Sequence, residues 1–200
     1  MTLFDHPDCP FGLKVRIMLA ETELEYDNIK VDLQAGDNHK ADFLELNPFG
    51  KVPVLVDDEA VVYDSTVINE YLNDEYFAEL LPEDSAQRAT ARILEDYADV
   101  AFTLPAMAAE RELARPLEDR DSERLDGARE VIRKGLSMLE RQLSEKEYLV
   151  GDYSLADVAF APTVLQLEKL EIKLEPSMAN VRAWITRLSE RPSMRKALAA

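Results

Sequence analysis

The sequence predicts two parts of different fold class, a mixed α/β domain over residues 1–76 and an all-helical domain over residues 89–200. The first part mixes the period-two runs that are typical of strands with the period-3.6 runs that are typical of helices. The second part contains helical patterns only. Residues 77–88 lie between them and include the run Leu80-Leu81-Pro82-Glu83-Asp84, which predicts a linker.

The first part is predicted to have the element order β-α-β-α-β-β-α. Alternation of Ile29, Val31 and Leu33 indicates a strand, and the pair Asp57-Asp58 indicates a hairpin turn. The expected elements are a strand at Leu3-Phe4, a helix over Phe11–Leu19, a strand over Tyr26–Leu33, a short helix over Lys40–Leu46, strands over Val52–Val56 and Ala60–Tyr63, and a helix that Ser65 can cap.

The second part is predicted to be a bundle of helices. The run Ser154-Leu155-Ala156-Asp157 resembles a capping box, with aspartate at the position usually held by glutamate. The expected helices run from about Ala86 to Arg111, from about Ser122 to Leu143, from Ser154 onward, from Pro176 onward, and briefly after Arg191-Pro192.

Composition and sequence patterns argue against several classes of function. A net charge of −17 argues against a nucleic-acid partner, because such proteins need basic patches. No run approaches about 18 apolar residues, so we expect no membrane span. The start of the chain does not look like a signal peptide, and a single cysteine suits a reducing compartment, so we expect a cytoplasmic protein. His6 and His39 lack metal-type spacing, so no metal is expected.

The only cysteine, Cys9, is predicted to lie at the turn from the first strand to the first helix. Pro10 suits the first helical position, where its missing N–H is not needed. The positive end of a helix favours a thiolate, which is the nucleophilic form of cysteine. Gly12 replaces the second cysteine of a redox pair, so disulfide chemistry would need an external thiol. The alternative is that Cys9 is a small buried apolar residue.

Two further features point to a receptor for a peptide-like ligand. A cis bond between Val52 and Pro53 would turn the main-chain groups of Val52 outward, whereas a trans proline on an edge strand is the alternative. Asp64 can pair with an ammonium, and the hydroxyl of Ser65 with the helix amides can accept a carboxylate. The alternative for Asp64-Ser65 is simple helix capping.

Together these motifs resemble the glutathione transferase family, and the match covers nearly the whole chain in the right order. The resemblance implies a thioredoxin-like domain (βαβαββα) followed by a helical-bundle domain, in a chain that forms a homodimer. The motifs that carry the resemblance are Cys9-Pro10-Phe11-Gly12, Asn47-Pro48-Phe49-Gly50-Lys51-Val52-Pro53-Val54-Leu55, Tyr63-Asp64-Ser65 and Gly151-Asp152-Tyr153-Ser154-Leu155-Ala156-Asp157.

The resemblance also implies a glutathione site. Val52, which precedes a proline that is cis in the family, would pair with the cysteinyl backbone of glutathione, and Asp64 and Ser65 would hold its γ-glutamyl end. The glycine carboxylate would be held by Lys51 and by His39, with Lys40 as an alternative to His39. The remaining implied site residues are Phe11 at the pocket mouth and Pro53 as the structural cis-proline.

Cys9 occupies the place of the family's catalytic residue and resembles the omega-like and beta-like branches. Those branches imply thiol transfer, dehydroascorbate reduction and deglutathionylation rather than simple conjugation. We therefore expect glutathione-dependent thiol transfer, or reduction or conjugation of a small electrophile, with glutathione as cosubstrate and Cys9 as the catalytic residue. A first alternative is a non-catalytic regulator of the stringent starvation protein A branch, which binds RNA polymerase. That branch typically lacks a cysteine at this position. A second alternative is a dehalogenase or isomerase of the same family.

Overall fold

The computed structural model describes residues 1–199, which form two compact units and confirm the predicted fold class. The first unit contains residues 1–79 together with the last helix, α9 (Pro192–Ala199), and the second contains residues 80–191. The contacts therefore divide the chain differently from the predicted boundary. The segment predicted to be a linker joins the units near residue 80, and α9 groups with the N-terminal elements.

The first unit is built around one sheet with the strand order β2-β1-β3-β4. β1 runs parallel to β2 and antiparallel to β3, and β3 and β4 form the predicted hairpin. The elements up to residue 79 follow the predicted βαβαββα order, with one short 3₁₀ turn before the second helix. They are β1 (Thr2–Asp5), α1 (Pro10–Glu21), β2 (Asp27–Lys30), η1 (Asp37–His39), α2 (Ala41–Leu46), β3 (Val54–Asp57), β4 (Ala60–Tyr63) and α3 (Ser65–Glu75).

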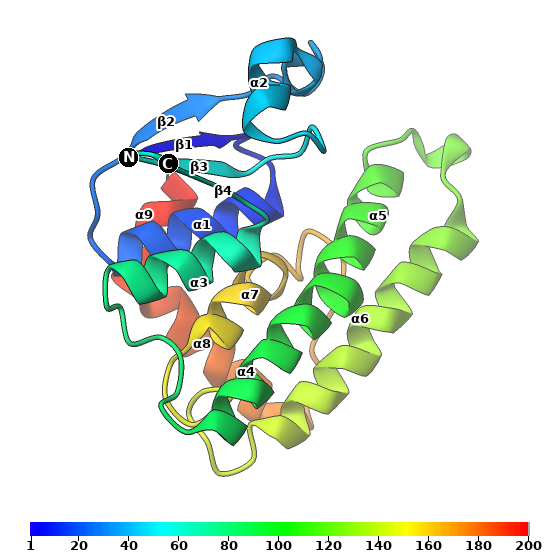
Figure 1. Ribbon diagram of the computed structural model, residues 1–200. Helices are drawn as coiled ribbons and strands as arrows, with labels where there is room; N and C mark the ends of the chain where they lie inside the picture. Colours follow the sequence, from blue (N-terminus) through cyan, green and yellow to red (C-terminus); the bar gives the residue numbers. More distant parts are fainter. Residues whose placement is uncertain (200) are drawn as a thin grey trace. The chain divides into compact units, whose positions relative to one another are not determined.

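Helices cover both faces of this sheet. Figure 1 shows α1 and α3 side by side on one face and α2 on the other. Phe43 of α2 packs with Val54 of β3 and with Phe4 of β1, whose ring meets that of Phe43 edge to face. Leu3 and Leu55 pair across β1 and β3 and are fully buried, which is expected for strands with helices on both faces.

The strand predicted over Tyr26–Leu33 forms, but it is shorter than expected and its burial differs. β2 ends at Lys30, and the side chains of Ile29 and Leu33 are exposed. Only Val31 of the three alternating residues is buried. The reason is that β2 is an edge strand, so it has a strand neighbour on one side only.

The last helix, α9, packs against α1. Met194 and Ala197 of α9 are buried, and the Ser193 hydroxyl donates a hydrogen bond to the Glu21 carboxylate at the end of α1. Figure 1 shows α9 beside α1, although almost the whole sequence separates the two helices. The first unit is therefore assembled from both ends of the chain.

The second unit is helical, as the sequence predicts. The long helix expected over Ala86–Arg111 is one continuous run whose middle widens into a π-helical turn, a feature that often accompanies a bulge in the hydrogen-bond ladder. The elements are α4 (Ser85–Ala98), η2 (Asp99–Thr103), α5 (Leu104–Leu113), η3 (Leu117–Asp119), α6 (Ser122–Gln142), α7 (Leu155–Val164) and α8 (Ala179–Glu190).

Aromatic rings form the centre of the second unit. Phe102 in the π-helical turn meets Phe160 of α7 edge to face, and Phe160 meets Trp184 of α8 in the same way. Phe102 fits because Gly135 of α6 has no side chain. A Cβ atom at Gly135 would lie 2.3 Å from the Phe102 ring. Close packing of this kind leaves little room for substitution.

The buried carboxylate of Asp157, in the first turn of α7, is hydrogen-bonded to Leu149, Ser154 and Trp184. One carboxylate oxygen accepts hydrogen bonds from the main-chain N–H and the hydroxyl of Ser154, at 3.0 and 3.1 Å. The other accepts from the Leu149 N–H at 3.2 Å and from the Trp184 indole N–H at 2.8 Å. Burial raises the pKa of Asp157 to about 6, although all four donors favour the charged form.

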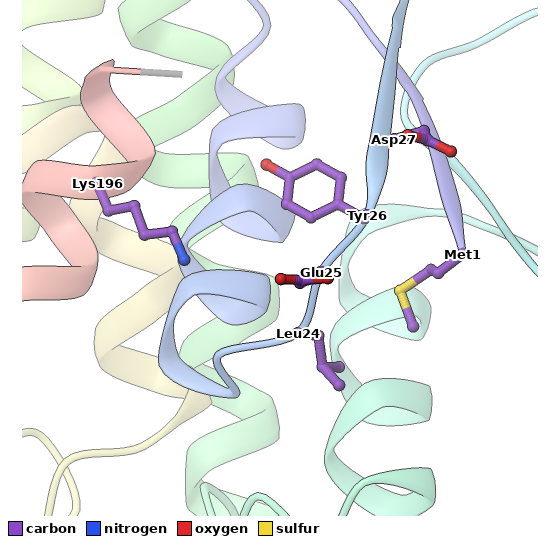
Figure 2. A pocket seen from close by; sticks show the side chains of 6 residues that line it. All are labelled: Met1, Leu24, Glu25, Tyr26, Asp27 and Lys196. Carbon is purple, nitrogen blue, oxygen red and sulfur yellow. The ribbon is translucent and has the colours of Figure 1, made fainter.

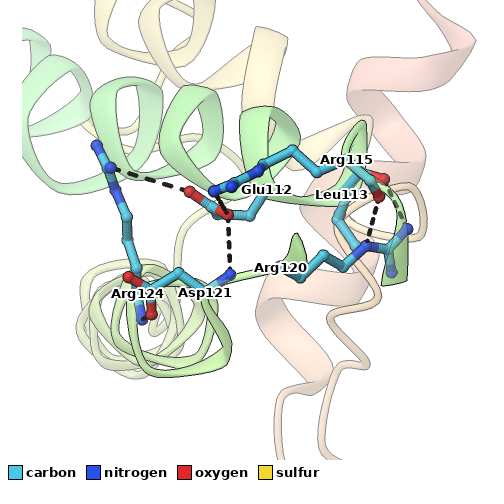
Figure 3. A network of polar contacts seen from close by, with 6 residues as sticks. All are labelled: Glu112, Leu113, Arg115, Arg120, Asp121 and Arg124. Carbon is cyan, nitrogen blue, oxygen red and sulfur yellow. Dashed lines mark hydrogen bonds and ion pairs between the residues drawn. The ribbon is translucent and has the colours of Figure 1, made fainter. Parts of the chain in front are cut away.

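A second polar network closes the turn between α5 and α6. The Glu112 carboxylate accepts hydrogen bonds from the Asp121 N–H and the Arg115 guanidinium, both at 3.1 Å, and Arg124 approaches it to 3.9 Å. Figure 3 shows Arg120 crossing back to main-chain carbonyls of the same turn. The bond from Asp121 is the main cause that lowers the pKa of Glu112.

No helix within residues 1–199 is both long enough and apolar enough to cross a membrane.

Replacing Asp157 by alanine is expected to lower the free energy of unfolding by about 3–5 kcal/mol, because it leaves buried donors without a partner. Urea unfolding followed by circular dichroism measures the change. The control is Asp152→Ala, at an exposed carboxylate in the same motif, which should change stability by less than about 0.5 kcal/mol. Equal midpoints for both variants would contradict a central role for Asp157.

Candidate functional site

Cys9 lies at the junction that the sequence predicts. It is the N-cap residue of α1, which begins at Pro10, and its main-chain N–H donates to the His6 carbonyl at 2.8 Å. The half-buried thiol points to the end of β3, where its Sγ atom lies 3.9 Å from the carbonyl oxygen of Val52. This contact joins the candidate nucleophile to the candidate peptide-binding residue.

The pKa of Cys9 bears on the thiolate that the sequence predicts. Burial raises the pKa of the Cys9 thiol from its ordinary value of 9.0 to about 11. The amides of Phe11 and Gly12 at the start of α1 lower the pKa, as a helix end should, but they do not offset the burial. The thiolate expected at Cys9 therefore stays a prediction, and burial of the thiol opposes it.

The loop before β3 is held by Asn47, which is almost fully buried. Its side-chain amide donates to the Lys51 carbonyl at 2.8 Å, and its side-chain oxygen accepts from the Phe49 N–H at 3.0 Å. The peptide bond between Val52 and Pro53 is cis. The two hydrogen bonds of the Asn47 side chain hold the path of the loop between α2 and β3.

The start of α3 is organised by Asp64 rather than by Ser65. Asp64 is the N-cap residue, and its Oδ1 atom accepts from the N–H groups of Thr66 and Val67 at 3.0 and 3.3 Å. Its φ of +76° is an uncommon conformation for a residue other than glycine. Ser65 is the first helical residue and is buried. The predicted cap by Ser65 is thus replaced by its neighbour.

These segments enclose a pocket of about 360 Å³ in the first unit. It brings together six of the predicted site residues, and Cys9 adjoins it through the contact with Val52. The predicted residues that line the pocket are Phe11, Lys51, Val52, Pro53, Asp64 and Ser65.

Three lining residues were not predicted from the sequence as site residues: Asn47, Phe49 and Tyr63. Asn47 and Phe49 belong to a run that the sequence marks as a turn, and Tyr63 belongs to a predicted strand. The rings of Phe49 and Tyr63 meet edge to face with centroids 6.0 Å apart, and Phe49 is 69% exposed. A large exposed aromatic residue in a turn is the signal that could have found Phe49.

His39 and Lys40, the alternatives for a glycine carboxylate, are not among the residues that line the pocket. His39 lies against Gly50, and its Nε2 atom is 3.3 Å from the side-chain nitrogen of Asn38. Lys40 forms an ion pair with Asp37 at 2.6 Å. A role for either residue in holding a ligand stays a prediction.

A different hollow of about 520 Å³ lies on the same unit, beside the segment between α1 and β2. Figure 2 shows Glu25 and Tyr26 of that segment, Asp27 at the start of β2, and Lys196 of α9. It contains none of the predicted site residues. Within residues 1–199 no group of three or more histidine, cysteine or acidic side chains is arranged to hold a metal ion.

The pocket offers separate positions for the ends of a small zwitterionic peptide. The first turn of α3 and the Ser65 hydroxyl suit a carboxylate, because helix N-termini present free N–H groups and a partial positive charge. Asp64 suits an ammonium, and Lys51 offers a second cation. The thiol of Cys9 lies beside the main chain of Val52, 3.9 Å from its carbonyl oxygen.

Comparison with known proteins agrees with this arrangement of a thioredoxin-like unit and a helical unit. Residues 8–75 match the glutathione S-transferase N-terminal domain, and residues 99–192 match the C-terminal domain of the same family. The chain is 34% identical to glutathione S-transferase GstB of Escherichia coli K12, over 92% of this chain and 90% of that protein. It belongs to the glutathione S-transferase family.

Two other relatives extend the comparison. Glutathione S-transferase 3 of Zea mays is 30% identical over 100% of this chain and 94% of its own length. The crystal structure of a serine-to-cysteine mutant of poplar glutathione transferase F1 superposes with a TM-score of 0.87. That match is 25% identical and covers 99% of this chain and 96% of the poplar chain.

Alkylation of Cys9 by N-ethylmaleimide is expected to accelerate about tenfold per pH unit between pH 7 and pH 9, because only the thiolate reacts and the pKa of about 11 lies above this range. The rate is measured by mass spectrometry, and Cys9 is the only cysteine. A short unstructured peptide with one cysteine is the control and should level off near pH 9. A plateau for the protein below pH 9 would show that burial does not control the thiol.

Proposed function

We propose that the protein is a glutathione transferase that binds glutathione in the pocket of the first unit and acts on a small electrophilic or disulfide substrate. The observation that carries the proposal is the contact of the Cys9 thiol with the Val52 carbonyl, at 3.9 Å. It brings a sulfur to the main-chain edge that would pair with the cysteinyl residue of the peptide. The pocket walls supply the groups for both ends of that peptide.

Binding would place each part of glutathione against a group of matching charge. The γ-glutamyl carboxylate would lie at the first turn of α3 beside the buried hydroxyl of Ser65. The ammonium would pair with Asp64, whose two capping bonds both use Oδ1 and leave Oδ2 to accept from a ligand. Lys51 would face the glycine carboxylate.

Conjugation is the chemistry that the electrostatics favour. With the pKa of Cys9 at about 11, the thiol keeps its proton near pH 7 and can donate a hydrogen bond to the glutathione sulfur. That bond stabilises the glutathione thiolate, which then attacks an electrophilic carbon and displaces its leaving group. Cys9 itself forms no covalent bond in this scheme.

Thiol transfer is the second candidate, favoured by the presence of a sulfur nucleophile at a helix N-terminus. The Cys9 thiolate would attack the glutathione sulfur of a mixed disulfide and release the other thiolate. Free glutathione would then attack the Cys9–glutathione disulfide, releasing oxidised glutathione and restoring Cys9. The low thiolate fraction of the ligand-free protein opposes this route.

Two substitutions at one position separate these chemistries. Cys9→Ser keeps a hydrogen-bond donor and cannot form a disulfide, whereas Cys9→Ala keeps neither. For conjugation of glutathione to 1-chloro-2,4-dinitrobenzene, we expect Cys9→Ser to keep most of the activity and Cys9→Ala to lose about tenfold, the loss of one hydrogen bond. Reduction of 2-hydroxyethyl disulfide by glutathione is measured on the same three proteins.

The outcomes distinguish the candidates. Loss of disulfide reduction in both variants, with an active wild type, would assign Cys9 as the nucleophile of thiol transfer. Equal activity of Cys9→Ala and wild type would remove Cys9 from the mechanism. If calorimetry detects no glutathione binding by the wild type, the transferase function is wrong, and a non-catalytic regulator of the RNA-polymerase-binding kind becomes the better candidate.

We also propose that the protein is a homodimer that associates through the second unit. Three apolar side chains along α4, η2 and the start of α5 are more than half exposed: Ile93, Val100 and Leu104. Apolar residues clustered in this way often mark a protein–protein contact. A second copy of the chain is the partner that the family resemblance implies.

The dimer proposal predicts that Ile93→Glu and Leu104→Glu each convert the protein to a monomer, because a buried carboxylate without a partner opposes association. Size-exclusion chromatography with light scattering measures the mass. Val131→Glu is the matched control, since Val131 is an exposed apolar residue of α6 and should leave the dimer intact. A monomeric wild type, or a dimeric Ile93→Glu variant, would refute the proposal.

The proposed chemistry suits a reducing compartment. Glutathione in its thiol form is a feature of such compartments, and the half-buried free thiol of Cys9 would persist there. We therefore retain the cytoplasm as the proposed location.

A further inference from the structure

The side chain of Asp5, the last residue of β1, lies against the first turn of α1. It is 1% exposed, and a Cβ atom added at Gly12 would lie 1.7 Å from its Oδ1 atom. The carboxylate thus occupies the space that any other side chain at position 12 would need. It lies directly behind the helix turn whose amides reach Cys9.

Arg16 is the side chain that pairs with this carboxylate, and a main-chain hydrogen bond from His6 also lowers the pKa of Asp5. Its Oδ2 atom accepts a hydrogen bond from Arg16 at 3.1 Å, and Arg16 is itself buried and donates a second bond to the Pro7 carbonyl. The Oδ1 atom, which faces Gly12, has no hydrogen-bond partner. A buried carboxylate that is only partly paired carries a substantial local field, because little solvent screens it.

This field acts on the thiol. Burial is the main cause that raises the pKa of Cys9. The negative charge of Asp5 raises it further, whereas the positive charge of Arg16 lowers it. His6, on the loop after β1, and Tyr26, before β2, are the other titratable side chains that interact with Asp5. Burial raises the pKa of Asp5 itself to about 6.

We propose that Asp5 is a positioning residue whose buried negative charge, held behind the first turn of α1 by Gly12 and Arg16, opposes ionisation of the Cys9 thiol and so adds to the effect of burial. Its place in catalysis rests on the proposed function, because a thiol that donates a hydrogen bond must keep its proton. Its effect on the reactivity of Cys9 does not need glutathione. Protonation of Asp5 below pH 6 would remove the charge and favour the thiolate.

The test is the rate of Cys9 alkylation by N-ethylmaleimide at pH 9. Arg16 lowers the pKa of Asp5, so a pH well above about 6 is needed for Asp5 to stay ionised in Arg16→Gln. Asp5→Asn should react about tenfold faster, a change of about one pKa unit, and Arg16→Gln should react more slowly. Opposite shifts distinguish an electrostatic role from a structural one, since loosening the ion pair from either side would expose the thiol and accelerate both variants. Asp8→Asn is the matched control, because Asp8 adjoins Cys9 in the sequence and its side chain is 94% exposed.

Asp8→Asn should change the rate less than about twofold, since solvent screens an exposed charge. A folded Asp5→Asn variant with the wild-type rate would overturn the proposal, as would faster reaction of both Asp5→Asn and Arg16→Gln. If circular dichroism shows that Asp5→Asn does not fold, the proposal is tested by the pH dependence of the alkylation rate of the wild-type protein. The logarithm of its rate should rise with a slope below one near pH 6, where Asp5 gains its charge, and a constant slope of one would overturn the proposal.

The alkylation rates of Cys9 also distinguish a failure of this inference from a failure of the proposed transferase function. A protein that binds no glutathione but shows the opposite shifts of Asp5→Asn and Arg16→Gln would retain the electrostatic inference and lose the proposed function. A protein that conjugates glutathione, but in which Asp5→Asn leaves the alkylation rate of Cys9 unchanged, would retain the proposed function and lose the electrostatic inference.

Discussion

The antiparallel pairing of β1 with β3 is the interaction on which the site depends. Because Phe4 pairs with Val54, the chain that leaves β1 toward Cys9 and the chain that enters β3 through Val52 meet at one end of the sheet. Val54 also pairs with Tyr63 of β4, so the start of α3 comes to the same end. Three segments that are distant in sequence thus converge through main-chain hydrogen bonds, whatever their side chains.

Two opposing effects act on the ionisation of Cys9 at the first turn of α1. Free N–H groups at a helix start stabilise negative charge, whereas removal from water destabilises it. At Cys9 the second effect is larger, and the carboxylate of Asp5 adds to it. The site therefore holds a thiol whose ionisation is opposed by burial, beside positive positions of the pocket, in a chain whose net charge is −17. The positive positions of the pocket are local, supplied by one helix end and by Lys51.

Local patterns predicted the elements and most of the pocket. Pro10 and Asp64-Ser65 mark helix starts through chemistry that acts within one turn, so the sequence alone locates them. The exposure of Ile29 could not be predicted, because it depends on β2 having a single strand neighbour. The pKa of Cys9 also could not be predicted from the sequence, because it depends on burial and on the Asp5 carboxylate, which the fold brings behind the first turn of α1. Family resemblance supplied the cis bond at Pro53, which propensity disfavours.

The return of α9 to α1 has a consequence for how the protein is made. A ribosome releases the strands and helices up to residue 79 well before Pro192, and N-terminal domains generally fold first during synthesis. Here the face of α1 against which α9 buries Met194 and Ala197 stays uncovered until the whole second unit has been synthesised. The nascent chain therefore carries an incomplete first unit through the synthesis of the second, and α9 closes that unit afterwards.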